Sequence, residues 1–273
     1  MITVQPAHRL RPSRRRDRPW RIALPLLAGL VVLALLAGLS TMTAVSWAQQ
    51  HRFPPAPAVH ELGTPRSLEL SSRFADVTVE RSSEVDQVTL ALVPAGSTDL
   101  PAAGATARAT VDTRTTADRL VATVREPAAS GPIPWQSESR DVLVLVPAAQ
   151  DLRLAVTTEV ADVAVDGSYS ALSVRTDTGD VDLENIASDG AVSVTSDVGD
   201  VDLQMRSGNA SPLRVRARTG DVSIAVPGQR QYDVTTHTSV GDVQIEPGLQ
   251  AASGAEAPEI SATTDVGDVT ISR

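Results

Sequence analysis

The sequence has no cysteine and no lysine among its 273 residues, and it has only seven aromatic side chains. Without cysteine the chain can form no disulfide, thiolate zinc site or iron–sulfur cluster, and it has no cysteine nucleophile. All 24 basic residues are therefore arginine, and they are outnumbered by 33 acidic residues, which gives a net charge of −9. Because contact with phosphates requires clustered positive charge, this balance excludes nucleic acid as the expected partner. Few aromatic residues are available for a core.

The charges are divided unevenly along the chain. Residues 1–21 hold seven arginines and one acid, whereas residues 22–51 hold no Asp, Glu or Arg. Residues 52–273 hold 17 arginines and 32 acids, so this part alone carries a charge of −15. The net charge of −9 therefore combines a basic N-terminal segment with a strongly acidic C-terminal part.

The apolar part of the uncharged segment predicts a membrane span. Residues 22–48 would form a helix of about 40 Å, and a spanning helix needs roughly 20 mostly apolar residues. Trp20 and Trp47 flank the segment, as interfacial aromatics do, and the Arg-rich tail 1–21 is expected to stay in the cytoplasm. We therefore expect a single-pass protein of the cell membrane with an extracytoplasmic C-terminal domain. The alternative is a signal peptide cleaved near Ala48, which would give a secreted protein.

Beyond this segment, the sequence predicts a Pro-rich spacer over residues 49–65 and a β-repeat domain over residues 66–273. Short runs with alternating apolar residues, bounded by Pro, Gly, Ser or Asp, predict strands throughout the domain. No window after residue 52 shows a convincing helical period. The domain is therefore expected to be all-β.

A Gly-Asp-Val step recurs in the regular repeats of residues 151–273. Its six copies are Ala161-Asp162-Val163, Gly179-Asp180-Val181, Gly199-Asp200-Val201, Gly220-Asp221-Val222, Gly241-Asp242-Val243 and Gly267-Asp268-Val269. An earlier Ala75-Asp76-Val77 resembles a degenerate seventh copy. Aliphatic residues occupy fixed positions before and after each step, two residues apart, which places them on one face of a strand. Each copy is thus expected to be a strand, a tight structural turn and a second strand.

A single copy cannot bury its apolar face, but stacked copies can. We therefore predict a parallel β-solenoid, or β-helix, with rungs of about 20 residues. Its thin core of Val, Leu and Ile would also explain the scarcity of aromatic residues. The alternative is an antiparallel β-sandwich of hairpins, and a parallel ladder through Val181, Val201 and Val222 would distinguish the two. We also expect the edge of the last rung to pair with a second copy of the chain.

The sequence resembles a known group of bacterial proteins. The resemblance is carried by Val144-Leu145-Val146-Pro147, by Leu152-Arg153-Leu154-Ala155-Val156 and by the repeated Thr-x-x-Gly-Asp-Val-x-Leu. It is similar to the bacterial putative-adhesin family of β-strand-repeat proteins, a domain of unknown function. The resemblance covers roughly residues 66–273 and implies a β-helix-like fold and a location in the cell envelope. It implies no catalytic residues.

Clustered acids in two neighbouring repeats suggest calcium, which prefers carboxylate oxygens. The candidates are Asp177, Asp180, Asp182, Asp197, Asp200 and Asp202. However, the glycine-rich nonapeptide of calcium-binding β-rolls is missing, and Arg218 and Ser239 replace the first acid in later copies. We therefore favour a ladder of turn-capping Asp residues beside a solvated acidic face, and we expect no metal or other cofactor.

Arg214, Arg216 and Arg218 alternate with apolar residues and should form a basic stripe on one strand. The stripe could hold an anionic polymer or membrane headgroups, but we favour pairing with acids of adjacent rungs, such as Asp200 and Asp202.

No catalytic motif is visible, so we do not expect an enzyme. The leading interpretation is an adhesin or scaffold of the cell envelope that binds an envelope glycan or a surface protein. One alternative is an accessory protein in envelope-stress signalling, and a less favoured one is a polysaccharide-active enzyme, which would rest on fold analogy alone.

Overall fold

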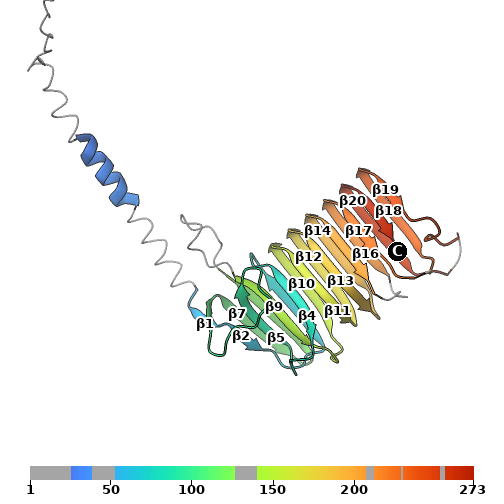
Figure 1. Ribbon diagram of the computed structural model, residues 1–273, viewed down its shortest axis with the longest axis horizontal. Helices are drawn as coiled ribbons and strands as arrows, with labels where there is room; N and C mark the ends of the chain where they lie inside the picture. The colour runs from blue at the N-terminus through green and yellow to red at the C-terminus, as the bar shows by residue number, and fades with distance from the viewer. Residues whose placement is uncertain (1–25, 39–52, 127–139, 207–211, 229, 253–255) are drawn as a thin grey trace, which may run out of the picture. The chain divides into compact units, whose positions relative to one another are not determined.

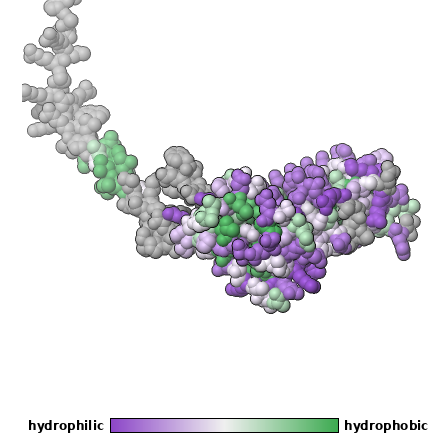
Figure 2. Space-filling model, turned by 60° about the horizontal axis from the view of Figure 1, so that its bottom comes forward, coloured by the Kyte–Doolittle hydropathy of each residue, from purple (hydrophilic) through white to green (hydrophobic). Residues whose placement is uncertain are grey.

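The structure is a computed structural model that describes residues 26–38, 53–126, 140–206, 212–228, 230–252 and 256–273. The chain divides into two compact units, Met1–Arg52 and Phe53–Arg273. In the first unit, residues 26–38 form a helix whose large apolar side chains are exposed, as the hydrophobic colour in Figure 2 shows. No helix among the described residues is long and apolar enough to cross a membrane. Both ends of the expected span, 22–25 and 39–48, lie outside the described residues, as does the Arg-rich tail.

The described residues of the second unit form 21 strands in three sheets (Figure 1). The nine-stranded sheet contains, in spatial order, β18 (Asp233–Val240), β20 (Glu259–Val266), β16 (Leu213–Thr219), β14 (Val192–Val198), β12 (Ala171–Thr178), β10 (Arg153–Val160), β3 (Ser67–Ser72), β8 (Arg119–Arg125) and β7 (Thr110–Thr116). The ten-stranded sheet contains β19 (Val243–Ile245), β21 (Val269–Ser272), β17 (Val222–Ala225), β15 (Val201–Met205), β13 (Val181–Ser188), β11 (Val163–Tyr169), β4 (Val77–Ser82), β9 (Arg140–Pro147), β5 (Thr89–Pro94) and β2 (Val59–Glu61). A third sheet pairs β1 (Pro55–Pro57) with β6 (Thr106–Arg108).

Neighbouring repeats pair in parallel. Each repeat places its first strand in the nine-stranded sheet and its second strand in the ten-stranded sheet, and we call such a pair of consecutive strands a rung. Val181 pairs with Val201, and Val201 pairs with Val222, in one parallel ladder. The predicted parallel stacking is therefore confirmed, and the alternative of antiparallel hairpins is wrong for the repeats.

The core lies between the two large sheets. In each rung the alternating aliphatic residues point inward, so that Leu154, Leu172 and Val192 follow one another in one sheet while Val163, Val181 and Val201 do so in the other. All six side chains are fully buried or nearly so. Burial of each such side chain stabilises the fold by roughly 1.5–3 kcal/mol. The sequence pattern predicts this core, because steps of two residues along a strand return to the same face.

The rungs do not follow chain order at either end of the stack. The last rung, β20–β21, lies between β16–β17 and β18–β19, as Figure 1 shows. Likewise, the rung β3–β4 lies between β8–β9 and β10–β11. The expectation that the C-terminal strand forms the open edge is therefore wrong, since β21 pairs on both sides. Among the described strands, the open edge at this end belongs to β18 and β19.

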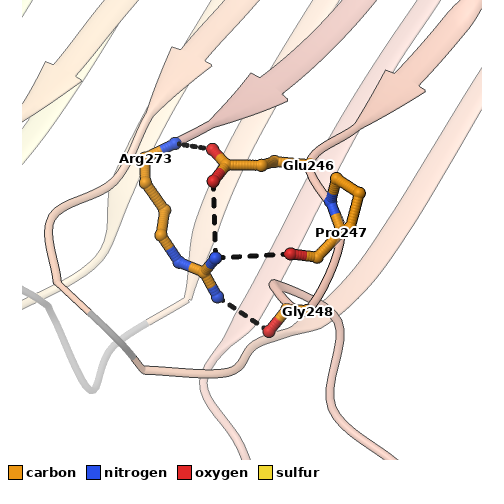
Figure 3. A network of polar contacts seen from close by, with 4 residues as sticks. All are labelled: Glu246, Pro247, Gly248 and Arg273. Atoms are coloured by element: carbon orange, nitrogen blue, oxygen red, sulfur yellow. Dashed lines mark hydrogen bonds and ion pairs between the residues drawn. The ribbon is translucent and has the colours of Figure 1, made fainter.

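The segment between β19 and β20 helps to hold this arrangement. Its Leu249 is fully buried. The loop also forms hydrogen bonds with Arg273, the last residue of the sequence. The backbone N–H of Arg273 donates to the carboxylate of Glu246 at 2.7 Å, and its guanidinium donates to the carbonyl of Gly248 at 2.7 Å (Figure 3). These contacts tie β21 to the loop that follows the outermost rung.

The predicted Pro-rich spacer is partly folded. Two short strands in it, β1 and β2, pair antiparallel with β6 and β5 respectively. Residues 49–52 of the predicted spacer lie outside the described residues.

Candidate binding surface

The Asp column at the turns forms a continuous ladder between rungs. The backbone N–H of Asp180 donates to the carboxylate of Asp162 at 2.8 Å, and the N–H of Asp200 donates to Asp180 at 2.8 Å. The same bond joins Asp162 to Asp76, Asp221 to Asp200, Asp268 to Asp221 and Asp242 to Asp268, at 2.8–2.9 Å. These residues therefore link neighbouring rungs instead of capping their own turns, and Asp76 does belong to the column.

The Gly column allows the same turns to stack closely. Gly179, Gly199, Gly220, Gly241 and Gly267 have φ between 138° and 144°. A Cβ at Gly199 would lie 2.1 Å from the carbonyl oxygen of Gly179, and the other four meet their neighbouring rung at the same distance. Only glycine fits, because it has no Cβ and tolerates positive φ. Ala161 departs from the column and keeps a negative φ.

A column of buried or partly buried hydroxyl groups lies beside these turns. Thr264 donates to the carbonyl of Gly220 at 3.0 Å, and Thr238 donates to that of Gly267 at 2.8 Å. Ser196 occupies the same column and is 1% exposed, but its hydroxyl has no hydrogen-bond partner. The turn residues thus form a structural edge of the domain.

The six calcium candidates have varied surroundings. Asp180 and Asp200 belong to the ladder, Asp177 lies 3.6 Å from the Arg175 guanidinium, and Asp197 lies 3.5 Å from that of Arg218. Asp182 and Asp202 are register neighbours on the outer face of the ten-stranded sheet. Partial burial, together with the nearby charges of Glu184 and Asp202, raises the pKa of Asp182 above its usual range. Among the described residues, no group of three or more His, Asp or Glu side chains could hold a metal ion.

No sequence pattern marks Glu126, a buried carboxylate that directly follows β8. Its Oε1 accepts the backbone N–H groups of Phe74 and Ala75 at 2.5 Å each, so it supports the turn of the rung β3–β4. Burial raises the pKa of Glu126, although these two hydrogen bonds act in the opposite direction. Its other oxygen, Oε2, is buried without a hydrogen-bond partner.

A shallow hollow lies beside β2. Its volume is about 660 Å³, and its walls include His60, Leu62 and Leu100. The Nε2 atom of His60 is buried without a partner. The hollow is separate from the repeats.

The outer face of the nine-stranded sheet carries the basic residues expected from the sequence. Arg214 of the predicted stripe pairs with Glu259 at 2.9 Å, and Arg218 pairs with Asp197 at 3.5 Å. The expected pairing with neighbouring acids is present for these two, but the partners are not Asp200 and Asp202. Arg216, between them, is exposed and forms no ion pair with any residue that the structure describes.

Register extends two residues of this stripe, Arg214 and Arg216, into a band across six strands, from β10 to β18. The first central column consists of Ala155, Ser173, Ser193, Arg214, Ser261 and Thr235. The second central column consists of Thr157, Arg175, Thr195, Arg216, Thr263 and His237. We call these twelve residues the central band, and none of them is buried or acidic. The repeat alignment could have revealed the band, because its members occupy equivalent positions in every copy.

Acidic residues on these six strands occur only at the sides of the band. Asp233 and Glu259 lie on one side, whereas Glu159, Asp177 and Asp197 lie on the other, together with Asp265. The band is therefore a strip of hydroxyl, guanidinium and imidazole groups in a domain of strongly negative charge.

Two solved structures and one family model are similar to this chain. Two solved structures resemble the chain: a putative cell adhesion protein from Clostridium sporogenes, with 12% identity and a TM-score of 0.47, and a putative adhesin from Bacteroides fragilis, with 11% identity and a TM-score of 0.45. Each similarity covers 80% of this chain. It covers 99% of the Clostridium sporogenes chain and 96% of the Bacteroides fragilis chain. No curated protein matches the sequence significantly. The family model Toastrack DUF4097 matches residues 66–272, and the chain therefore belongs to this family.

Proposed function

We propose that this protein is anchored in the cell membrane by its N-terminal helix and acts as an adhesin or scaffold of the cell envelope. In this proposal the second unit lies outside the membrane, and it binds a partner through the outer face of a sheet without catalysing a reaction. The observation that carries the proposal is the regular outer face of the nine-stranded sheet, where equivalent polar groups repeat from strand to strand.

The N-terminal sequence supports the anchor. The helix 26–38 lies within the uncharged segment 22–51, and its exposed side chains include Leu30 and Leu33, which are 67% and 70% exposed. Such a surface is unfavourable in water and suits a lipid environment. The seven arginines of residues 1–21 favour a cytoplasmic N-terminus.

The repeat architecture supports binding. Parallel strands about 4.8 Å apart present their outward residues at a constant interval, and the described strands β10 to β18 do so without a break in the stack. An extended partner with its own regular repeat can contact such a surface at many points, so that weak contacts combine into useful affinity.

The anchor is tested by protease treatment of intact cells that produce the full-length protein with a tag at either end. We expect protease to remove the C-terminal tag and to spare the N-terminal tag. Leu33→Arg places a charge in the apolar segment at a cost of roughly 2.5–3.5 kcal/mol, and it should shift the protein out of the membrane fraction. Equal protection of both tags would contradict the proposed orientation.

Binding is tested with full-length protein in a mild detergent and with isolated cell envelopes. We expect saturable binding that free envelope polymers inhibit. Absence of binding to envelopes would contradict the proposed function.

A further inference from the structure

We propose that the central band binds a linear anionic glycan, a sugar polymer with a carboxylate or phosphate on alternate sugars. This inference rests on the proposed function, and it assigns both the surface and the chemical class of the ligand. Seven of the twelve band residues are Ser or Thr, three are Arg and one is His. Hydroxyl and guanidinium groups are the partners that sugar hydroxyls and anionic groups require.

The spacing within the band points to a polymer. In the second central column, Thr157, Thr195 and Thr263 alternate with Arg175, Arg216 and His237. Nitrogen-containing groups therefore recur on every second strand, about 9.6 Å apart if strands are spaced by 4.8 Å. A sugar in an extended chain advances by a distance comparable to one strand spacing. A glycan lying across the strands would thus present its anions to these groups and its neutral sugars to the threonines.

Charge around the band restricts the ligand further. Arg216 forms no ion pair with any described residue, while Arg175 is only 3.6 Å from Asp177 and Arg214 is 2.9 Å from Glu259. Because Asp177, Glu259 and the other acids at the sides of the band repel negative charge, an anionic ligand is favoured only along the band itself. Nucleic acid, with a charge every 1.7 Å or so, would bring many phosphates against the acids at both sides. A polymer with widely spaced anions can place each anion against Arg175, Arg216 or His237 and keep its neutral sugars beside the threonines.

The test uses full-length protein in a mild detergent and fluorescent hyaluronate, a linear polymer with one carboxylate on every second sugar. Arg175→Gln and Arg216→Gln should each weaken binding about two- to fivefold, the range expected for an exposed ion pair. The double variant should lose roughly tenfold, and binding should weaken with added salt because exposed charges are screened. Thr195→Asp, which places an acid between the two arginines, should abolish binding.

Arg153→Gln provides the matched control. Arg153 is exposed on β10 of the same sheet but lies outside the central band, so this variant should bind hyaluronate like the unaltered protein. Neutral dextran should not bind. Circular dichroism spectra of all variants should coincide, since none of the altered side chains is buried.

Three results would overturn the inference. The first is no binding of hyaluronate, and the second is equal binding by the unaltered protein and the Arg175→Gln/Arg216→Gln variant. The third is preferential binding of polyuridylate RNA or phosphatidylglycerol vesicles through the same arginines, which would assign the band to another class of partner. If isolated envelopes still bind the double variant fully, the inference fails while the proposed function stands. If the unaltered protein binds no envelopes, the proposed function itself fails.

Discussion

The contact between Gly199 and the preceding rung gives the sharpest test of the stacking. In the variant Gly199→Ala, the new Cβ would lie 2.1 Å from the carbonyl oxygen of Gly179, and the residue would have to keep a φ of 139°. The unfavourable backbone conformation costs roughly 1–3 kcal/mol, and the overpacking adds roughly 1–3 kcal/mol. The free energy of unfolding should therefore fall by about 4 kcal/mol, the sum of the midpoints of the two ranges.

A matched glycine separates the two contributions. Gly104 also has a positive φ, of 83°, but no atom lies within 4 Å of the position where its Cβ would be. Gly104→Ala should thus cost only the backbone term, about 1–2 kcal/mol. For a domain of this size, 1 kcal/mol corresponds to roughly 2–4 °C in melting temperature. We expect Gly199→Ala to lower the melting temperature by about 8–16 °C and Gly104→Ala by about 2–8 °C.

Thermal unfolding of both variants, followed by far-ultraviolet circular dichroism, measures this difference. Urea unfolding provides a second estimate if the transition is a single step. Equal losses in the two variants would refute the reasoning, because the close approach between rungs would then contribute nothing.

Three further predictions concern the ladder, the buried carboxylate and the open edge. Asp200→Ala removes the acceptor of the Asp221 N–H and should lower the free energy of unfolding by about 0.5–1.5 kcal/mol. Asp200→Asn keeps an acceptor oxygen and should retain most of that free energy. Equal losses for the two variants in chemical denaturation would argue against the ladder. Because burial raises the pKa of Glu126, its ionisation opposes folding above the ordinary carboxyl pKa. Glu126→Gln should therefore melt higher than the unaltered protein at pH 7–8, and this advantage should shrink as the pH falls toward about 4; a pH-independent difference would contradict the assignment. If copies associate through β18 and β19, Val243→Lys on the exposed edge should lower the mass measured by light scattering, and an unchanged oligomer would exclude this edge.

The repeat register could be predicted from the sequence because each aliphatic column has a direct physical cause. The positions two and four residues after the Gly column are Val, Leu or Ile in every copy, and the structure buries them in all rungs except β18–β19. The Asp and Gly columns are likewise predicted from the sequence to be turn residues. Their bonds to the neighbouring rung became visible only in the structure.

The order of the rungs could not be predicted from those columns. Every rung presents almost the same aliphatic residues to its neighbours. The burial of apolar side chains therefore does not determine which two rungs lie side by side. Two signals were nevertheless present in the sequence. Thr236 places a hydroxyl in a column that is otherwise Val or Ala, as expected of an end rung, and the longest insertion, 247–258, gives the chain room to return between β16–β17 and β18–β19.

Glu126 and the central band were missed for different reasons. Glu126 belongs to the rung β8–β9, where no repeat pattern marks it, and its hydrogen bonds join residues about 50 positions apart. The central band is not evident from the sequence, where only the three arginines of one strand form a recognisable pattern. Its extent depends on which strands are neighbours, and therefore on the order of the rungs.

That order is central, because it brings β20 between β16 and β18 and so completes the central band. The absence of cysteine allows a direct test with paired substitutions in the full-length protein. Arg214 is the register partner of Ser261, which in turn pairs with Thr235. Neighbouring strands place Cα atoms within the usual disulfide range of 4.4–6.8 Å or so, whereas alternate strands are about 9.6 Å apart. Under mild oxidation, the pair Arg214→Cys with Ser261→Cys should form an intramolecular disulfide detectable by mass spectrometry, and Arg214→Cys with Thr235→Cys should not. A disulfide in the second pair but not in the first would show that the rungs follow chain order and would contradict the account.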